Sequence, residues 1–254
     1  MNQITILRTT KDLIQWRSTI HNRSVGFVPT MGALHEGHAS LLKKSRAEND
    51  ISVLSIFVNP TQFNQAHDLA KYPRTWDADV KLASDNAVDV IFSPTFEEIY
   101  PDNYTFSVHE NDFSQMLCGA SRPGHFQGVL TIVLKLFNLV QPARVYMGEK
   151  DYQQLQLIKK MVAALFLNTE IIGCPTIRNT DGLALSSRNA RLTEEERKNS
   201  SLIYKIITTA QTAHDARIAL ERAGFKIDYL VDVDKRRYIA AYVGEVRLID
   251  NVAL

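Results

Sequence analysis

The chain has 254 residues, and its 29 Lys and Arg nearly balance its 28 Asp and Glu, which gives a formal net charge of +1. Proteins that bind nucleic acid usually carry a basic face for the phosphate backbone, so this balance argues against nucleic acid as a partner. A small anionic ligand in a local site stays allowed. A chain of this length buries about three quarters of its unfolded surface and needs no disulfides to fold.

No feature of the sequence predicts export or membrane insertion. The most apolar window, residues 129–140, contains Lys135 and is too short to span a bilayer. Residues 1–16 lack the apolar core of a signal peptide. Cys118 and Cys174 are too few for a disulfide framework and are expected to be small buried side chains. We therefore expect a cytoplasmic protein with no membrane partner.

Apolar segments alternate with helical patterns through the first two thirds of the chain. Buried strands are expected at 25–29, 51–59, 88–94, 144–148 and 168–174. Apolar residues at helical spacing occur in 38–50, 74–87, 126–140 and 151–166. Strands that are apolar throughout, separated by helices, predict an α/β fold with a parallel sheet covered by helices on both faces.

The pattern changes after Cys174. A polar loop leads to Thr193 and Glu196, whose spacing is a capping box. A helical pattern then runs to about Arg222, and Gly224 can end it. The last thirty or so residues resemble a few strands. The sequence thus predicts one domain at 1–175 and a smaller α+β domain at 176–254.

The junction after the strand at 25–29 contains the strongest candidates for a functional site. Residues 29–41 read PTMGALHEGHASL. Ligands of parallel sheets bind beyond the carboxyl ends of the strands, and a helix that begins near His38 would direct free amides at them, which favours phosphate. Gly32 and Gly37 would let the backbone approach a ligand closely.

Three interpretations of His35 and His38 are open at this point. They could be ordinary polar residues at a helix start. They could bind zinc, but the metalloprotease pattern HExxH is absent and no Cys/His cluster supplies further ligands. They could donate to ATP phosphates in a nucleotide site with an HxGH signature. The glycines, the junction and the neutral composition favour the nucleotide site, although the dinucleotide fingerprint GxGxxG is absent.

Two later segments add groups that suit phosphate. Lys150 follows the strand at 144–148, where an ammonium group can neutralise a transferring phosphoryl group. The segment 185–189, LSSRN, combines two hydroxyls with a guanidinium in the loop between the two predicted domains. Each segment alone could be an ordinary solvated loop, but their order after HxGH is specific.

A series of longer motifs carries a resemblance to a known family. PTMGALHEGHASL is followed by FVNPTQF (57–63), YPRT (72–75), SRPGHFQGV (121–129), GEKDYQQ (148–154), DGLALSSRN (181–189) and RLIDN (247–251). This series resembles that of the pantothenate synthetases (pantoate–β-alanine ligases), in the HxGH nucleotidyltransferase superfamily, over nearly the whole chain. The resemblance implies a Rossmann-like N-terminal domain, a small α+β lid domain and usually a homodimer.

The same resemblance implies an activity and its substrates. The family condenses pantoate with β-alanine, using ATP and Mg²⁺, through a pantoyl-adenylate, in pantothenate and coenzyme A biosynthesis. It implies catalytic roles for His35, His38 and Lys150, with His38 at the proton-donor position. It implies ATP contacts by Met31, Gly32, Ala33, Leu34, His35, Glu36, Gly37, His38, Gly148, Glu149, Lys150, Asp151, Ile177, Leu185, Ser186, Ser187 and Arg188. It implies that Gln62 and Gln154 hold pantoate, with Gln62 also near β-alanine.

Two departures from the family pattern stand out. Only residues 231–235 separate Leu230 from Arg236, fewer than the family generally carries there, so we expect a shortened lid domain. Leu185 stands where methionine is common, a swap of nearly equal volume.

Two rival functions share the phosphate site. Another HxGH nucleotidyltransferase would not need paired glutamines, and a non-catalytic nucleotide-binding module would bind ATP without pantoate-dependent exchange.

Overall fold

The computed structural model describes residues 4–254, which divide into two compact units. The first unit holds the described residues up to Gly148, together with Gln153–Cys174. The second holds Glu149–Tyr152 and Pro175–Leu254. The short turn Glu149–Tyr152 therefore packs with the C-terminal part of the chain, although it follows a strand of the first unit.

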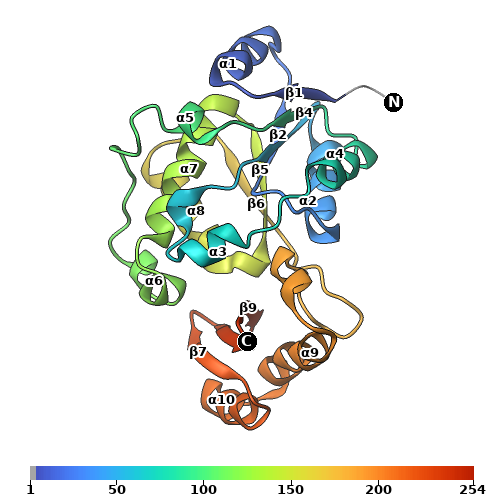
Figure 1. Cartoon of the computed structure of the whole chain (residues 1–254). Coiled ribbons are helices and arrows are strands. Elements are labelled where there is room, and N and C mark those ends of the chain that lie inside the picture. The colour runs from blue at the N-terminus through green and yellow to red at the C-terminus, as the bar shows by residue number, and fades with distance from the viewer. Residues whose placement is uncertain (1–3) are drawn as a thin grey trace. The chain divides into compact units, whose positions relative to one another are not determined.

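The first unit is built on a six-stranded parallel sheet with the order β1-β4-β3-β2-β5-β6 (Figure 1). Its strands are β1 (Thr5–Leu7), β2 (Val25–Thr30), β3 (Ile51–Ile56), β4 (Val90–Phe92), β5 (Arg144–Gly148) and β6 (Glu170–Cys174). The five strands predicted from apolar runs are confirmed. The edge strand β1 was not predicted, because its three residues are too few to show a period.

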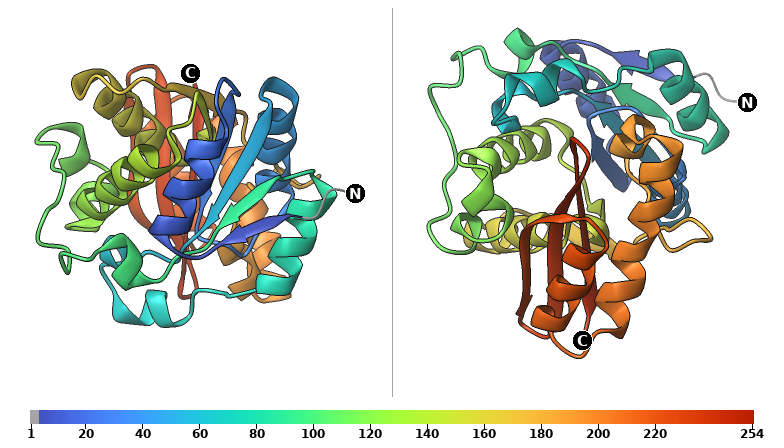
Figure 2. Two further views of the ribbon diagram at one scale, coloured as in Figure 1. Left: turned by 90° about the horizontal axis from the view of Figure 1, so that it is seen from above. Right: turned by 60° about the horizontal axis from the view of Figure 1, so that its bottom comes forward.

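Helices cover both faces of this sheet. The helices of the first unit are α1 (Thr10–Thr19), α2 (Glu36–Glu48), α3 (Ala66–Ala70), α4 (Trp76–Asp85), α5 (Phe96–Ile99), α6 (Cys118–Ser121), α7 (His125–Val140) and α8 (Tyr152–Ala164). Short 3-10 segments are η1 (Pro60–Gln62), η2 (Phe113–Gln115) and η3 (Glu149–Asp151). In Figure 1 and Figure 2, α2 and α4 lie on one face, and α7 and α8 lie on the other. The predicted α/β class is confirmed.

The strand order contains one switch point that matters for a ligand. The chain moves outward from β2 through β3 to β4, and then returns to β5 and continues to β6 on the other side. Because connections to parallel strands are right-handed, α2 and α8 leave β2 and β5 on opposite faces. The carboxyl ends of β2 and β5 therefore flank the crevice where open α/β sheets bind ligands.

The core beneath α2 and α4 is apolar. Val28, Leu54 and Ile91 come from three neighbouring strands, and Leu42 and Ala83 come from the two helices. All five side chains are inaccessible to solvent. Cys118 and Cys174 are buried, as the sequence predicted.

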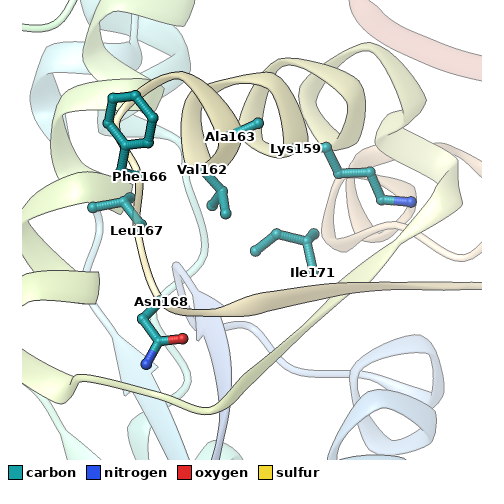
Figure 3. Close-up of a pocket in the computed structure, with 7 residues that line it drawn as sticks. All are labelled: Lys159, Val162, Ala163, Phe166, Leu167, Asn168 and Ile171. Atoms are coloured by element: carbon teal, nitrogen blue, oxygen red, sulfur yellow. The ribbon is translucent and has the colours of Figure 1, made fainter.

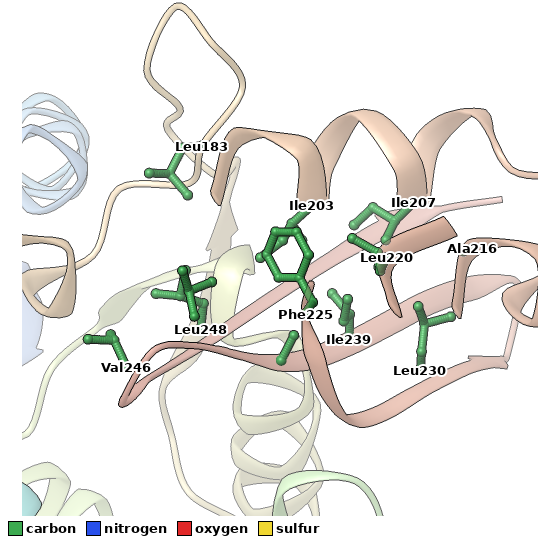
Figure 4. Packing of buried hydrophobic residues seen from close by; sticks show 12 residues of the cluster. Leu183, Ile203, Ile207, Ala216, Leu220, Phe225, Leu230, Ile239, Val246 and Leu248 are labelled. Atoms are coloured by element: carbon green, nitrogen blue, oxygen red, sulfur yellow. The ribbon is translucent and has the colours of Figure 1, made fainter. Parts of the chain in front are cut away.

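The second unit combines two helices with a three-stranded antiparallel sheet. The elements are η4 (Ser187–Arg191), α9 (Glu194–Thr209), α10 (Ala213–Arg222), β7 (Lys226–Val233), β8 (Arg236–Val243) and β9 (Val246–Ala253). Figure 4 shows its apolar core, in which Ile203, Ile207 and Leu220 of the helices pack with Ile239 and Leu248 of the strands. The capping box of Thr193 and Glu196 is confirmed, and Gly224 follows α10 with a φ of 87°.

The helical pattern predicted from Thr193 to Arg222 is two helices, not one. Arg237, only 1% exposed, donates to the carbonyl oxygens of Ile207, Ala210 and Gln211, and its guanidinium pairs with Asp232. These carbonyls at the end of α9 are therefore satisfied without a continued helix. Thr212 then caps α10 by accepting from the Asp215 amide. The Arg237 guanidinium also holds the pKa of the Asp232 carboxyl below its usual range.

Among residues 4–254, the helices are all too short or too polar to cross a membrane.

Candidate active site

The loop after β2 is held by a buried carboxylate. Gly32 and Ala33 both have positive φ angles, 78° and 49°, which glycine adopts freely and alanine does not. Asp79 of α4, 2% exposed, accepts from the Ala33 amide at 3.0 Å and the Leu34 amide at 2.8 Å. Its carboxylate also accepts from the Thr75 hydroxyl. A side chain at Gly32 would approach the Asp79 carboxylate within 2.9 Å, so glycine permits this close packing.

The two histidines of HxGH form the start of α2. The helix begins at Glu36, two residues before the expected position, and His35 is its N-cap. His35 Nδ1 accepts from the Gly37 amide at 3.1 Å, and His38 Nδ1 accepts from the His35 amide at 3.3 Å. A neutral imidazole carries one proton, and Nδ1 accepts a hydrogen bond in both rings, so the proton is on Nε2 in each of them. With ring centroids 4.1 Å apart, the pair supplies two adjacent Nε2–H donors at a helix N-terminus.

The turn after β3 carries Gln62. Asn59, 1% exposed, donates from Nδ2 to Gln62 Oε1 at 3.1 Å. The backbone carbonyl of Gln62 accepts from His125 Nδ1 at 2.8 Å and from Arg122 at 3.3 Å. A Cβ at Gly128 would lie 2.4 Å from the Thr61 carbonyl oxygen, so glycine lets α7 pack against this turn. Both the backbone and the side chain of Gln62 are thus held in place.

The two glutamines at the start of α8 differ in their surroundings. Gln153 is buried and anchors the loop 113–118, since it accepts from the Cys118 amide and donates to the carbonyls of Phe113 and Met116. Gln154 is only partly buried. The structure therefore explains Gln153 by packing and leaves Gln154 as the one with solvent access.

The turn with Lys150 directly follows β5 but is bound by the C-terminal sheet. Asn251 of β9 donates to the carbonyl oxygens of Glu149 and Lys150, each at 2.9 Å. Arg236 of β8 donates to Asn251 Oδ1 and stacks on the ring of Tyr152 at 3.7 Å. The Lys150 ammonium lies 3.8 Å from the Asp151 carboxylate.

The segment 177–188 forms a hairpin followed by a short helix. The Leu185 amide donates to the Ile177 carbonyl at 2.9 Å, so these two predicted residues are neighbours. Gly182, with a φ of 92°, lies in the connecting turn. Ser186 caps η4 and accepts from the Arg188 amide at 3.3 Å.

Asp250 of β9 holds this hairpin. It receives two hydrogen bonds from the Arg178 guanidinium, at 2.6 and 2.8 Å, and Arg178 also stacks on Tyr204. The Asp250 side chain is 5% exposed. Two adjacent residues of the RLIDN segment, Asp250 and Asn251, therefore bind the two predicted ATP segments of the second unit.

The first unit also has a surface hollow of about 440 Å³. It is formed by the end of α8 and by β6 and is lined by Lys159, Val162, Ala163, Phe166, Leu167, Asn168 and Ile171 (Figure 3). None of the predicted site residues lines it.

The structure therefore groups the predicted residues into two sets. Residues 31–38 and Gln62 follow the adjacent strands β2 and β3 in the first unit, and Gly148 ends β5 on the other side of β2. Gln154, in the first turn of α8, also belongs to the first unit. Residues 149–151, Ile177 and 185–188 belong to the second unit. Sequence reasoning missed Asp79, Asn59 and Asn251. Asp79 had a signal, because it occupies an apolar position of α4 between Trp76, Val80 and Ala83.

A parallel sheet with helices on both faces, and an HxGH junction at its switch point, define a Rossmann-like protein of the HxGH class. The family model for pantoate-beta-alanine ligase matches residues 5–253. The chain belongs to this family, and it is an enzyme of the family.

Individual relatives match along almost their entire length. A pantothenate synthetase from Bdellovibrio bacteriovorus is 55% identical over 249 residues, which cover 98% of this chain and 99% of that protein. The crystal structure of a pantoate-beta-alanine ligase from Francisella tularensis, complexed with beta-gamma ATP and beta-alanine, is 42% identical with a TM-score of 0.95. The match covers 99% of this chain and 98% of that one. A pantothenate synthetase structure from Thermus thermophilus is 40% identical, with a TM-score of 0.89 and coverage of 98% and 99%.

These coverages bear on the expected shortening of the C-terminal domain. The chain spans 98% or more of each of these three relatives, so no long segment of theirs is missing from it. The expected shortening concerns the family in general, so it stays a prediction.

Proposed function

We propose that this enzyme condenses pantoate with β-alanine to give pantothenate, using ATP and passing through a pantoyl-adenylate. The full-length match to a ligase crystallised with beta-gamma ATP and beta-alanine is the observation that carries the proposal. The HxGH junction at the switch point supports a nucleotide at that edge of the sheet.

The first half-reaction activates the pantoate carboxylate. A carboxylate is a poor acylating agent because its leaving group would be oxide. Its oxygen attacks the α-phosphorus of ATP, the bond to pyrophosphate breaks, and the product is a mixed anhydride with AMP as the leaving group. Catalysis of such a step depends on in-line alignment and on donors that match the charge of the phosphoryl oxygens.

We assign those donors to the HxGH histidines and the later basic and hydroxyl residues. Two Nε2–H groups of His35 and His38 suit phosphoryl oxygens, and the N-terminus of α2 adds its positive end. Lys150 supplies an ammonium group. In this proposal Ser186, Ser187 and Arg188 close on the triphosphate, with the remaining ATP contacts made by the segments 31–38, 148–151, Ile177 and Leu185.

Gln62 and Gln154 are proposed to hold pantoate. An amide can orient hydroxyls and a carboxylate without the tight ground-state ion pair that an arginine would form, so the nucleophile keeps its reactivity. In the second half-reaction the amine of β-alanine attacks the acyl carbon, the bond to AMP breaks, and one proton leaves the nitrogen. We assign no residue as the base for that proton.

Mg²⁺ is part of the proposal only as a partner of the nucleotide. Within residues 4–254, no group of three or more His, Cys, Asp or Glu side chains could hold a metal ion. Mg²⁺ commonly binds through substrate phosphates, waters and one or two carboxylates, which needs no such group. No step above depends on it.

Three further features belong to the proposal. Residues 1–175 would form the ATP and pantoate domain and 176–254 the lid. The protein would be a homodimer in the cytoplasm, and light scattering of the purified protein tests the dimer.

Pantoate-dependent exchange between ATP and labelled pyrophosphate tests the proposal. We expect exchange with pantoate and none without it. Exchange that needs no pantoate would indicate another nucleotidyltransferase, and bound ATP without exchange would contradict the proposed chemistry.

A further inference from the structure

A small buried network lies behind Gln62, and the proposed function does not use it. Tyr100, 2% exposed, donates its hydroxyl to Asn59 Oδ1 at 2.9 Å. The Thr61 hydroxyl donates to the same oxygen at 3.0 Å. Asn59 Nδ2 faces the other way, toward Gln62 Oε1 at 3.1 Å and the Gly128 carbonyl oxygen at 3.3 Å.

The chemistry of these partners fixes the direction of the Asn59 amide. A backbone carbonyl can only accept, so the Asn59 atom beside Gly128 must be the NH₂ group. The Oδ1 atom then faces Tyr100 and Thr61, whose hydroxyls both donate to it. Burial raises the pKa of Tyr100 to about 12, so its hydroxyl keeps the proton that it donates.

The direction of Asn59 determines the direction of Gln62. Because Asn59 presents an NH₂ group, Gln62 must turn Oε1 toward it. The NH₂ group of Gln62 is then the part of the amide that faces away from Asn59. A glutamine held in this way recognises an acceptor, such as a carboxylate or hydroxyl oxygen, and not a donor.

We propose that Tyr100, acting through Asn59, is a positioning residue that makes Gln62 a hydrogen-bond donor to the hydroxy-acid substrate. This inference rests on the proposed function, in which Gln62 holds pantoate. Tyr100 does not touch the substrate in this account. It holds Asn59, and Asn59 sets which atom of Gln62 is presented.

Replacement of Tyr100 by Phe separates this role from packing. The Tyr100 ring packs near Phe57, Phe96 and Tyr104, with centroid distances of 6.4, 4.8 and 5.3 Å, and phenylalanine keeps all three contacts. Only the hydroxyl is lost, so Asn59 Oδ1 keeps Thr61 as its donor and is held less firmly. Gln62 can then populate the opposite orientation, in which its Oε1 atom faces an oxygen of the substrate and two acceptors meet.

The test is a double-mutant cycle in the full-length enzyme, with KM measured separately for pantoate and ATP. Tyr100→Phe should raise the pantoate KM about tenfold, the effect of one buried hydrogen bond, and leave the ATP KM within about twofold. In a Gln62→Ala background, Tyr100→Phe should change the pantoate KM by less than about twofold, because residues that act as a unit are not additive. Tyr104→Phe, which removes a hydroxyl from the neighbouring ring, is the matched control and should behave as wild type.

Three results would overturn the inference: an unchanged pantoate KM, an equal rise in both KM values, or effects of Tyr100→Phe and Gln62→Ala that multiply. If thermal melts show Tyr100→Phe unfolded at the assay temperature, Thr61→Val replaces it in the cycle, because it removes the other donor to Asn59. The same three results for its KM values would overturn the inference. A wild-type enzyme that does not turn over pantoate would instead overturn the proposed function and, with it, this inference.

Discussion

Two loops of this enzyme carry the main predicted phosphate contacts, and they are held in opposite ways. The loop 31–35 follows β2, and its amides are bound by Asp79 of α4 in the same unit. The turn Glu149–Asp151 follows β5, but its carbonyls are bound by Asn251 of β9 in the C-terminal unit. One loop is held through its donors by a carboxylate, and the other is held through its acceptors by an amide.

This difference shows that chain position does not decide which unit holds a loop. Lys150 is covalently next to the parallel sheet because Gly148 ends β5. Its backbone partners nevertheless belong to the C-terminal sheet. The geometry of His35 and His38 should therefore depend on the first unit alone, and the geometry of Lys150 should depend on β9.

The largest expected effect comes from removing the group that each loop carries. His38→Ala and Lys150→Ala should each slow adenylate formation by at least about a hundredfold, the scale of losing one transition-state donor. Single-turnover formation of the adenylate measures this. His21→Ala and Lys159→Ala, at exposed positions, are the controls and should react as wild type. A near wild-type rate in either site variant would remove that residue from the mechanism.

A second change should disturb only the first loop. Asp79→Asn keeps the size of the side chain but replaces one accepting oxygen with a donor that faces a backbone N–H. We expect a loss of about 1–3 kcal/mol in the free energy of unfolding, because a buried amide loses its acceptor. The ATP KM should rise about tenfold or more, the equivalent of 1.4 kcal/mol or more.

Thermal melts and ATP titrations measure the two effects. Asp77→Asn is the matched control, since Asp77 is an exposed acid in the same first turn of α4. If Asp79→Asn binds ATP as wild type does, the carboxylate does not shape the HxGH loop.

A third change should disturb only the turn with Lys150. Asn251→Ala removes two hydrogen bonds to carbonyls that water can partly replace, so we expect a three- to tenfold loss, or about 1 kcal/mol, in the rate of adenylate formation. In a Lys150→Ala background the same change should have little further effect, because Asn251 acts through Lys150. The exposed Asn199→Ala is the control. Full additivity of the two changes would show that β9 does not position Lys150.

The smallest expected effect is at Leu185. Leu185→Met changes the side chain at nearly constant volume, so kcat and both KM values should stay within about twofold. Steady-state kinetics measures them, and a tenfold change in the ATP KM would mean that this side chain shapes the nucleotide site directly.

Much of the fold could be predicted because strong periodic patterns report burial. Segments such as 144–148 are apolar throughout, as a strand buried on both faces requires. The start of α10 had a local signal that the prediction of one helix overlooked, because Thr212 with Asp215 three residues on is a capping pattern. The Arg237 contacts that satisfy the carbonyls at the end of α9 could not be predicted, because Arg237 follows the break by more than twenty residues. A helical period carries no information about such a partner.

The site shows the same limit. The HxGH junction is local in sequence, so its histidines could be named before the structure was known. Asp79 and Asn251 hold loops that lie 45 or more residues away in the chain. Their partners are backbone atoms, which have no sequence signature of their own, so only the fold reveals them.

The formation of a discrete acyl-adenylate is the central claim, and rapid quench with labelled ATP tests it most directly. A mixed anhydride survives only where water is excluded, and the segment Ser186–Arg188 is proposed to exclude it. With pantoate and no β-alanine, we expect about one bound adenylate and one pyrophosphate per site. AMP should be released only slowly, because the bound intermediate is shielded from water. β-Alanine should then release AMP rapidly. If no adenylate accumulates, and AMP and pyrophosphate appear together only when β-alanine is present, the two-step account is contradicted.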